Sequence, residues 1–465
     1  MSVQILYPVL TLAILASGCR WTGANPACTS AELQHHVEKS GAQTIVTTVD
    51  LLACVKTAVK NVEDDVDVVV YSDILQDKPR ADWPNVENDH DFTTLHDMLR
   101  NRDTTSMVER LESIDGESIA TLMSTSGSTG LPKLAQRTHM ALIQESRVIE
   151  DNEEMKPYDV RRLYCTPAIW GAYPFPAMVI NSLRLGIPSY FVRQFEGSLV
   201  NKIYKYNITE VVLVPHVVCS ILDQCSKDPK PIEIQSLQMV SSAGAPLAPA
   251  LRERFLERFD VPPRIVQVWG LTECGWLSTF KHPESDDTGS VGRMLPGCEI
   301  RTCSEDVTTN GDGVGELCVR GPQLMTGYRG NEAAMAKAIR SDGWFYTGDI
   351  GYIENGKVYI VGRLKDIIKV NGVVVSPTEL EDTLYKCPGV SDCAAFGKGY
   401  GVDEHPVLSI VAADDSLSAD RIRDHLHSNL SSYKADKCEV HFVESIPRNR
   451  GGKILRDRLK QEMNK

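Results

Sequence analysis

Apolar segments alternate with segments of mixed character at the start of the chain. The apolar segment 9–18 predicts a buried helix; it also has the length of a signal-peptide core ending at Cys19, but no Lys or Arg precedes it, which favours the helix. The pattern then predicts, in order, a helix over 30–40, a strand over Thr44–Thr47, a helix near 50–60 and a strand over Val66–Tyr71. This alternation is typical of parallel α/β layers.

A polar segment interrupts this pattern at 76–106 and predicts a surface connection. An apolar run over Ile119–Met123 then predicts a short buried strand. A loop rich in Ser, Thr and Gly follows, and Thr138–Ile149 can form a helix. A strand, a glycine loop and a helix in succession would be a favourable context for binding an anion.

The remainder of the chain predicts two more kinds of structure. Further βα units are expected from 161 to 270, whereas glycines and short β segments dominate from 285 to 345 and predict a distorted β-barrel. A smaller α/β domain completes the chain. The expected division is a large domain over 1–362 with its barrel at about 285–362, a hinge over 363–366 and a small domain over 367–465.

The composition indicates a globular protein of at least two domains, with 465 residues, 42% of them apolar and 24% charged. The net charge of −13 argues against a nucleic-acid partner. No apolar segment is long enough to span a bilayer, so no membrane partner is expected. The 13 cysteines have no zinc-site spacing, which indicates reduced thiols and a cytoplasmic protein.

The most informative chemistry lies in the run from Thr125 to Lys133. It combines hydroxyl groups, two glycines and one cation in the order Thr125, Ser126, Gly127, Ser128, Thr129, Gly130, Leu131, Pro132 and Lys133. Glycine lets backbone N–H groups turn toward an anion, and the lysine adds a mobile positive charge. The run predicts a polyphosphate-binding loop, although a run of this composition taken alone is more often an ordinary flexible loop.

Four more motifs follow it along the chain, at Val268–Glu273, Gly343–Asp349, Gly362–Lys369 and Pro447–Lys453. In this order the five motifs resemble the adenylate-forming superfamily of acyl-CoA synthetases, peptide-synthetase adenylation domains and luciferases. The chain is most similar to 4-coumarate–CoA ligases and related acyl-CoA ligases. The resemblance implies an α/β fold: a large N-terminal domain of parallel αβ layers plus a distorted β-barrel, then a small mobile α/β domain. It also implies that the chain lacks an N-terminal segment usual in the family.

The resemblance implies that ATP activates a carboxylic acid to acyl-AMP, and that transfer to CoA gives acyl-CoA, AMP and pyrophosphate. Thr272 would then lie near the phosphates and Glu273 near Mg²⁺, a hard cation that prefers oxygen ligands. Asp349 would accept hydrogen bonds from the ribose hydroxyls, and Trp269 would stack on adenine. The other nucleotide-binding residues implied are Thr125, Ser126, Gly127, Ser128, Thr129, Gly130, Lys133, Gly244, Ala245, Pro246, Gly270 and Arg363.

Lys453 is, by resemblance, the lysine that promotes adenylation. An ammonium that arrives only when the small domain closes can neutralise the carboxylate and the α-phosphate together. By composition alone, its basic surroundings would instead predict an exposed tail. Lys365 occupies the family's hinge position, about which the small domain turns between half-reactions. That rotation would bring Lys369 and Gly372 to the site for reaction with CoA.

The acid pocket is the least determined part of the site. Trp170, Ser242, Ala243 and Leu271 are the expected pocket residues, although Trp170 could equally be part of the core. Where many ligases of the family have two prolines after a strand, this chain has Pro215 followed by His216. No lysine or arginine is evident in the pocket motifs, so an aromatic or medium-chain acid with one carboxylate is expected.

Two alternatives to a CoA ligase remain at this point. The chain could load its acyl-AMP onto a carrier protein, or it could be a catalytically impaired homologue, given the implied missing segment. Pyrophosphate exchange without a CoA thioester would favour the carrier-protein alternative.

Overall fold

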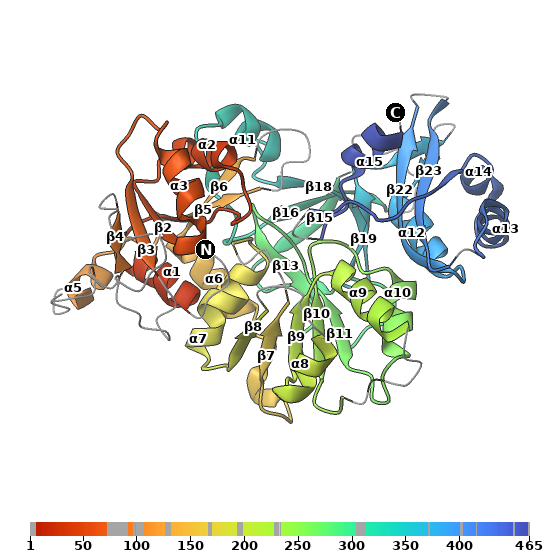
Figure 1. Ribbon diagram of the computed structural model, residues 1–465, viewed down its shortest axis with the longest axis horizontal. Coiled ribbons are helices and arrows are strands. Elements are labelled where there is room, and N and C mark those ends of the chain that lie inside the picture. The colour runs from red at the N-terminus through yellow and green to blue at the C-terminus, as the bar shows by residue number, and fades with distance from the viewer. Residues whose placement is uncertain are drawn as a thin grey trace.

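The computed structural model has two lobes, a large lobe that runs from red to green in Figure 1 and a small blue lobe beside it. It describes residues 6–71, 92–95, 98, 107–125, 132–165, 170–192, 199–226, 232, 234–303, 313–370, 373–399, 403–414, 416–449 and 452–463. The predicted segment 76–106 therefore lies mostly outside the described residues. The mixed α/β architecture with parallel sheets and a small C-terminal lobe confirms the predicted fold class.

The N-terminal region confirms the predicted alternation of helices and strands. A capping box begins the second helix, because the Thr29 side chain accepts from the Glu32 N–H while the Glu32 carboxylate accepts from the Thr29 N–H. Gly41 ends that helix in the left-handed conformation, with φ of 61°. The elements are α1 (Leu6–Ala16), β1 (Trp21–Thr22), α2 (Ser30–Ser40), β2 (Thr44–Thr48), α3 (Leu52–Val59), β3 (Asp67–Tyr71), β4 (Thr93–Thr94) and α5 (Met107–Glu112), with β2, β3 and β4 forming a parallel sheet.

The predicted order of strand, glycine loop and helix is wrong around the phosphate loop. β5 (Ile119–Ser124) pairs antiparallel with β6 (Leu134–Thr138), and α6 (His139–Val148) begins only after this second strand. The Thr125 N–H donates to the Lys133 carbonyl at 2.8 Å and closes the two ends of the loop. The loop is therefore the tip of a β-hairpin, so no helix N-terminus follows it directly; residues 126–131 lie outside the described ranges.

A five-stranded parallel sheet in the order β8-β7-β9-β10-β11 forms the centre of the large lobe and confirms the predicted βα units. α9 and the loop after β10 begin at the carboxyl edge of this sheet, and both line the cavity between the lobes. The elements are β7 (Arg162–Tyr164), α7 (Ser182–Arg184), β8 (Ser189–Phe191), α8 (Leu199–Lys205), β9 (Glu210–Leu213), α9 (Pro215–Ser226), β10 (Met239–Ser242), α10 (Pro249–Leu256) and β11 (Arg264–Gln267).

Antiparallel sheets replace the parallel ones after β11, in the region where glycines and short β segments predicted a barrel. One sheet has the order β12-β13-β14 and the other β15-β16-β18-β19, while β17 pairs with β6. The elements are β12 (Trp269–Leu271), β13 (Gly275–Thr279), β14 (Arg293–Met294), β15 (Glu299–Cys303), β16 (Gly315–Arg320), β17 (Gly327–Tyr328), α11 (Glu332–Ala338), β18 (Phe345–Glu354) and β19 (Lys357–Arg363). The barrel boundaries stay a prediction.

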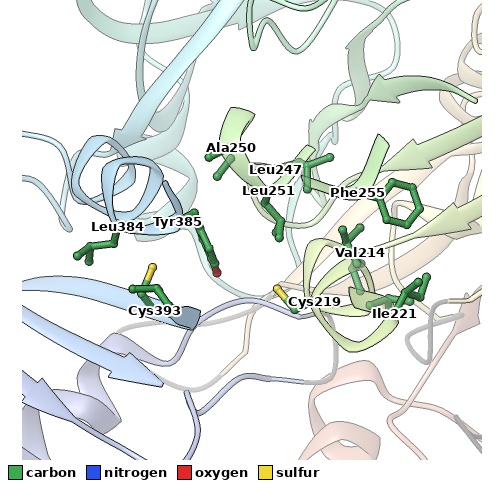
Figure 2. Close-up of a cluster of buried hydrophobic side chains, with 14 of the residues drawn as sticks. Val214, Cys219, Ile221, Leu247, Ala250, Leu251, Phe255, Leu384, Tyr385 and Cys393 are labelled. Atoms are coloured by element: carbon green, nitrogen blue, oxygen red, sulfur yellow. The ribbon is translucent and has the colours of Figure 1, made fainter. Parts of the chain in front are cut away.

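The small lobe packs on the large lobe through a continuous apolar cluster. Figure 2 shows Leu384, Tyr385 and Cys393 of the small lobe opposite Cys219 and Leu251 of α9 and α10. Its elements are β20 (Ile368–Val370), β21 (Val373–Val375), α12 (Pro377–Tyr385), β22 (Val390–Lys398), β23 (His405–Ala412), α13 (Ala419–Asn429), α14 (Ser432–Ala435), β24 (Glu439–Phe442) and α15 (Arg456–Met463). Within the described ranges, no helix is both long and apolar enough to cross a membrane.

Candidate active site

A cavity of about 170 Å³ lies between the two lobes. Residues of both lobes line it, and the sequence motifs predicted several of them. The predicted residues that line the cavity are Gly244, Ala245, Pro246, Trp269, Gly270, Asp349, Arg363 and Lys453. Residues that lie about 200 positions apart in the chain (Gly244 and Lys453) thus share one cavity, as a two-lobe nucleotide site requires.

Two side chains of the cavity hold the carboxylate of Asp349 in place. The Arg363 Nε lies 2.7 Å from its Oδ1, and the Trp269 indole Nε1–H donates to its Oδ2 at 2.9 Å. The side chain is buried at 4% exposure. A carboxylate offers about four acceptor positions, so two donors leave room for hydroxyl donors from a ligand. Trp269 was expected to stack on adenine; the structure adds a second role, since its N–H fixes the carboxylate that was expected to bind ribose.

Lys453 enters the cavity from the small lobe, on a turn that closes on itself. The Asn449 N–H donates to the Lys453 carbonyl at 2.9 Å, and the Asn449 Oδ1 accepts from the Lys453 N–H at 3.0 Å. Burial, and next the Arg363 guanidinium, lower the pKa of Lys453 to about 8, while the Asp349 carboxylate opposes that shift. The lysine is therefore a desolvated cation beside the groups expected to bind the nucleoside, rather than part of an exposed tail.

A second group of side chains lies at Lys133, the C-terminal end of the predicted phosphate loop. The Lys133 ammonium lies 4.6 Å from the centre of the Tyr328 ring, and the Tyr328 hydroxyl donates to the Glu273 Oε1 at 2.7 Å. Burial, and next the Glu273 carboxylate, raise the pKa of Tyr328, so its hydroxyl remains a donor. Lys133 and Glu273, which come from different motifs, thus meet through Tyr328. The two residues lie outside the lining of the cavity itself.

Comparison with known proteins identifies the fold and the family. The family model described as AMP-binding enzyme matches residues 3–329, and the model for the AMP-binding enzyme C-terminal domain matches residues 379–453. The chain belongs to the AMP-binding enzyme family. The predicted superfamily is thereby confirmed.

Relatives and solved structures of the AMP-binding family agree with this assignment. The chain is 46% identical to acyl-CoA ligase M9 of Phoma sp. over 99% of this chain and 86% of that protein. It is 34% identical to phenylacetyl-CoA ligase epaB of Aspergillus niger over 99% of this chain and 85% of that protein. Among solved structures, the anthranilate CoA ligase AuaEII in complex with anthranoyl-AMP has a TM-score of 0.80, with 20% identity over 98% of this chain and 84% of that one.

Mg²⁺ bound to ATP is typical of AMP-binding enzymes, and the Glu273 carboxylate is a suitable ligand for this ion. No cluster of three or more His, Cys, Asp or Glu side chains is arranged for a metal in the described part of the chain. Mg²⁺ is commonly held by one or two carboxylates together with substrate phosphates, so a dedicated cluster is not needed. The Glu273 Oε1 accepts from Tyr328, which leaves the Oε2 for a cation.

The structure does not bring every predicted residue to the cavity of this AMP-binding enzyme. Trp170 packs against the apolar cluster that contains Trp21, which supports its role in the core. Lys369 is exposed on β20. Lys365 is also exposed, and its Nζ lies 3.8 Å from the Asp366 Oδ1. Thr125, Ser242, Ala243, Leu271 and Thr272 do not line the cavity either, although Thr272 adjoins Glu273. Ser126, Gly127, Ser128, Thr129, Gly130 and Gly372 lie outside the described residues.

Sequence reasoning missed two residues of the candidate site. Tyr328 joins Lys133 to Glu273, but it lies 55 positions from Glu273 and belongs to none of the five motifs. His216 was noted only as a departure from the family's proline pair, yet it lines the cavity together with Lys453. The unusual residue at 216 was the available signal, since a histidine replaces a rigid residue at the carboxyl edge of the central sheet.

Proposed function

We propose that this chain joins an aromatic carboxylic acid to the α-phosphate of ATP, with Lys453 as the group that promotes the step, and then transfers the acyl group to CoA. The reaction class, AMP-forming acid–thiol ligation, agrees with the prediction and is confirmed by a 46% identical relative named an acyl-CoA ligase. The roles of individual residues and the class of acid are the new parts of the proposal.

The observation that carries the proposal is the convergence of Lys453 and Asp349 on one interlobe cavity. The substrate carboxylate and the α-phosphate repel one another, and charge accumulates on the phosphoryl oxygens as the bond forms. The Lys453 ammonium can offset both charges, because it lies in a desolvated place where electrostatic attraction is strong. Asp349 would hold the ribose at the fixed distance that this geometry needs.

Each remaining residue has a simple role in the proposed step. Arg363 orients the Asp349 carboxylate and can donate to the ribose or the α-phosphate. Lys133 would hold the β- and γ-phosphates, and the Glu273 carboxylate would hold the accompanying Mg²⁺. When bound, this ion would supply charge neutralisation. The carboxylate attacks the α-phosphorus, the bond to the β-phosphate oxygen breaks and pyrophosphate leaves. The CoA thiolate then attacks the acyl carbon, and AMP leaves.

An aromatic acid is supported by the side chains behind β10. Tyr173 and Trp276 stack with ring centroids 5.4 Å apart, and the Tyr173 hydroxyl lies 3.1 Å from the Ser241 Oγ. Tyr173, Trp276 and the predicted pocket residue Ala243 belong to one apolar cluster, and Ser241 precedes the predicted pocket residue Ser242 on β10. Stacked rings favour a flat ligand, and a relative is named a phenylacetyl-CoA ligase. A carrier protein as acyl acceptor is not favoured, since the relatives are named as CoA ligases.

Pyrophosphate exchange over a panel of acids tests the proposal. ATP-dependent exchange should appear with arylacetic or benzoic-type acids before aliphatic acids of similar size, and added CoA should convert the acyl-AMP to a thioester detectable by mass spectrometry. Exchange with no acid in the panel would support the alternative of an impaired homologue. Exchange without a thioester would support a carrier protein as acceptor, and a preference for aliphatic acids would contradict the aromatic assignment.

A further inference from the structure

The turn that carries Lys453 rests directly on a histidine of the other lobe. A methyl group built on Gly452 would lie 2.4 Å from the His216 Nδ1 and 3.1 Å from the Val214 Cγ2. The φ of Gly452 is +82°, a conformation that residues with a Cβ rarely adopt. Both facts mean that the backbone of the turn approaches the imidazole edge as closely as only glycine allows.

His216 is not held in place by a hydrogen bond at the nitrogen that faces the turn. Its Nδ1 is buried and has no hydrogen-bond partner in the structure. An unpaired buried nitrogen costs free energy, so the ring position needs a compensating cause. His216 is the second residue of α9 and lines the same cavity as Lys453 and Asp349. The Gly452 backbone contacts this ring, and the charged groups that act on it are Arg448 and Asp392.

Hydrogen bonds among the described residues of the turn link Gly452 to Lys453. The Gly452 N–H donates to the Asn449 carbonyl at 2.9 Å, in addition to the two bonds that join Asn449 and Lys453. Arg448 and Ile454 pair at the base of the turn. Because the turn is closed by its own hydrogen bonds, displacing Gly452 would displace the Lys453 backbone with it.

Several hydrogen bonds between the lobes attach other elements. The Asp382 Oδ1 accepts from the Ala250 N–H at 2.9 Å, and the Arg254 Nη1 donates to the Val390 carbonyl at 3.1 Å. The Ser391 hydroxyl donates to the Asp223 carboxylate at 3.2 Å. These contacts fix α12 and the start of β22 against α9 and α10. They hold the lobes together, and the Arg448 Nη2, which donates to the Asp392 Oδ1 at 2.9 Å, ties the base of the Lys453 turn to β22. Among the described residues, the contact of Gly452 with His216 is the one made by the turn next to Lys453 itself.

We propose that His216 is a positioning residue for adenylation. The Gly452 backbone rests against the His216 imidazole, and this contact, called the seat below, fixes how far Lys453 reaches into the cavity. This inference rests on the proposed role of Lys453 and adds the contact through which the large lobe places it. The seat acts only while the lobes are closed in this arrangement. The transfer of a preformed acyl-AMP to CoA, which does not need Lys453, should therefore not depend on His216.

The two half-reactions distinguish a seat from a merely structural residue. His216→Ala should lower acid-dependent pyrophosphate exchange by about tenfold or more, because a displacement of about 1 Å at a reacting group can cost a hundredfold. Conversion of supplied acyl-AMP to thioester should stay within about twofold of wild type. Gln224→Ala, an exposed change on the same helix, is the matched control and should alter neither step. Equal losses in both half-reactions would overturn the inference.

A double-mutant cycle tests the contact itself. Gly452→Ala should lower exchange strongly in wild type, because the new methyl group meets the imidazole, but less in the His216→Ala background, where only the strained φ remains. A coupling of about fivefold or more is expected for residues in direct contact. Gly389→Ala controls for the strain alone, since Gly389 has φ of +95° and only ordinary contacts with Leu417. The same Gly452→Ala loss in both backgrounds would refute the seat.

Failure of this inference differs from failure of the proposed function. If Lys453→Ala leaves exchange intact, the proposed adenylation role is wrong. If Lys453→Ala abolishes exchange but the His216→Ala change and the cycle have no effect, the lysine role stands and the seat alone is refuted. Thermal unfolding midpoints of all variants show whether a loss reflects folding instead.

Discussion

The two ends of the candidate nucleotide site are built in different ways. At the nucleoside corner (Asp349, Trp269, Arg363 and Lys453), side chains from four motifs line one cavity, and the Asp349 carboxylate pairs with both Arg363 and Trp269. At the phosphate corner (Lys133, Tyr328 and Glu273), an exposed lysine lies over an aromatic ring. One corner is preorganised by hydrogen bonds, whereas the other presents its cation to solvent.

This difference teaches where a substitution should be costly. A buried and mutually bonded group loses several interactions when one partner is removed, and the remaining partners are left unpaired. An exposed cation loses less, because water and salt already screen it. We therefore expect the largest losses at the nucleoside corner and smaller ones at the phosphate corner.

Lys453→Ala should have the largest effect of all. Adenylation, measured as pyrophosphate exchange, should fall by about 100- to 1000-fold, the range for removing one preorganised group that stabilises transition-state charge. Thioester formation from supplied acyl-AMP should persist, because the ammonium is not needed there. An equal fall in both half-reactions would remove Lys453 from its proposed role and with it the contrast between the corners.

Asp349→Ala should come next, with an increase of about 10- to 100-fold in the KM for ATP. The change removes the proposed ribose acceptor and leaves the Arg363 guanidinium and the Trp269 N–H without their shared partner. Asp342→Ala is the matched control, since that carboxylate lies directly before the same motif but is exposed and pairs with Arg301. An unchanged affinity for ATP, measured by calorimetry, would contradict the assignment.

The sequence predicted the nucleoside corner better than the phosphate corner, for a physical reason. Asp349 and Lys453 belong to short motifs whose order along the chain carries the resemblance to the family, and both line the cavity. The hairpin at the phosphate loop was missed because Leu134–Thr138 mixes apolar and polar residues over only five positions, too few to show a period.

Contacts between distant segments were beyond the sequence altogether. The Trp269–Asp349 bond joins residues 80 positions apart, and the Gly452 contact with His216 depends on how two lobes meet. Motif order indicates that such residues belong to one site, but it does not give the register and packing that decide which atoms touch. Tyr328 was missed for the same reason, since only the pairing of β17 with β6 brings it to Lys133.

The pH dependence of adenylation should reveal the desolvated lysine. The pKa of Lys453 is lowered to about 8, so the ammonium is present below that pH and is lost as the pH rises through it. The kcat/KM for exchange should therefore fall by about tenfold per pH unit above the pKa. Lys453→Arg should remove this alkaline limb, because a guanidinium stays charged. A limb that persists in the arginine variant would assign it to another group.

Trp269→Phe should have a moderate effect on the nucleoside corner. The variant keeps an aromatic ring but loses the N–H that bonds the Asp349 Oδ2, a bond to a charged acceptor. The KM for ATP should rise by about 5- to 20-fold, while kcat changes little. Trp344→Phe is the control, because it replaces a half-buried indole that stacks with Arg301. A fall in kcat with an unchanged KM would mean that Trp269 acts on the chemical step instead.

Tyr328→Phe should have the smallest effect and so sharpens the contrast between the corners. The ring that faces Lys133 remains, and only the hydroxyl that donates to the Glu273 Oε1 is lost. The freed carboxylate keeps its charge and is half-buried, so water can replace the lost donor. The Mg²⁺ concentration for half-maximal exchange should shift by about threefold or less. A loss as large as that of Asp349→Ala would show that the phosphate corner is as preorganised as the nucleoside corner, and the proposed difference between them would be wrong.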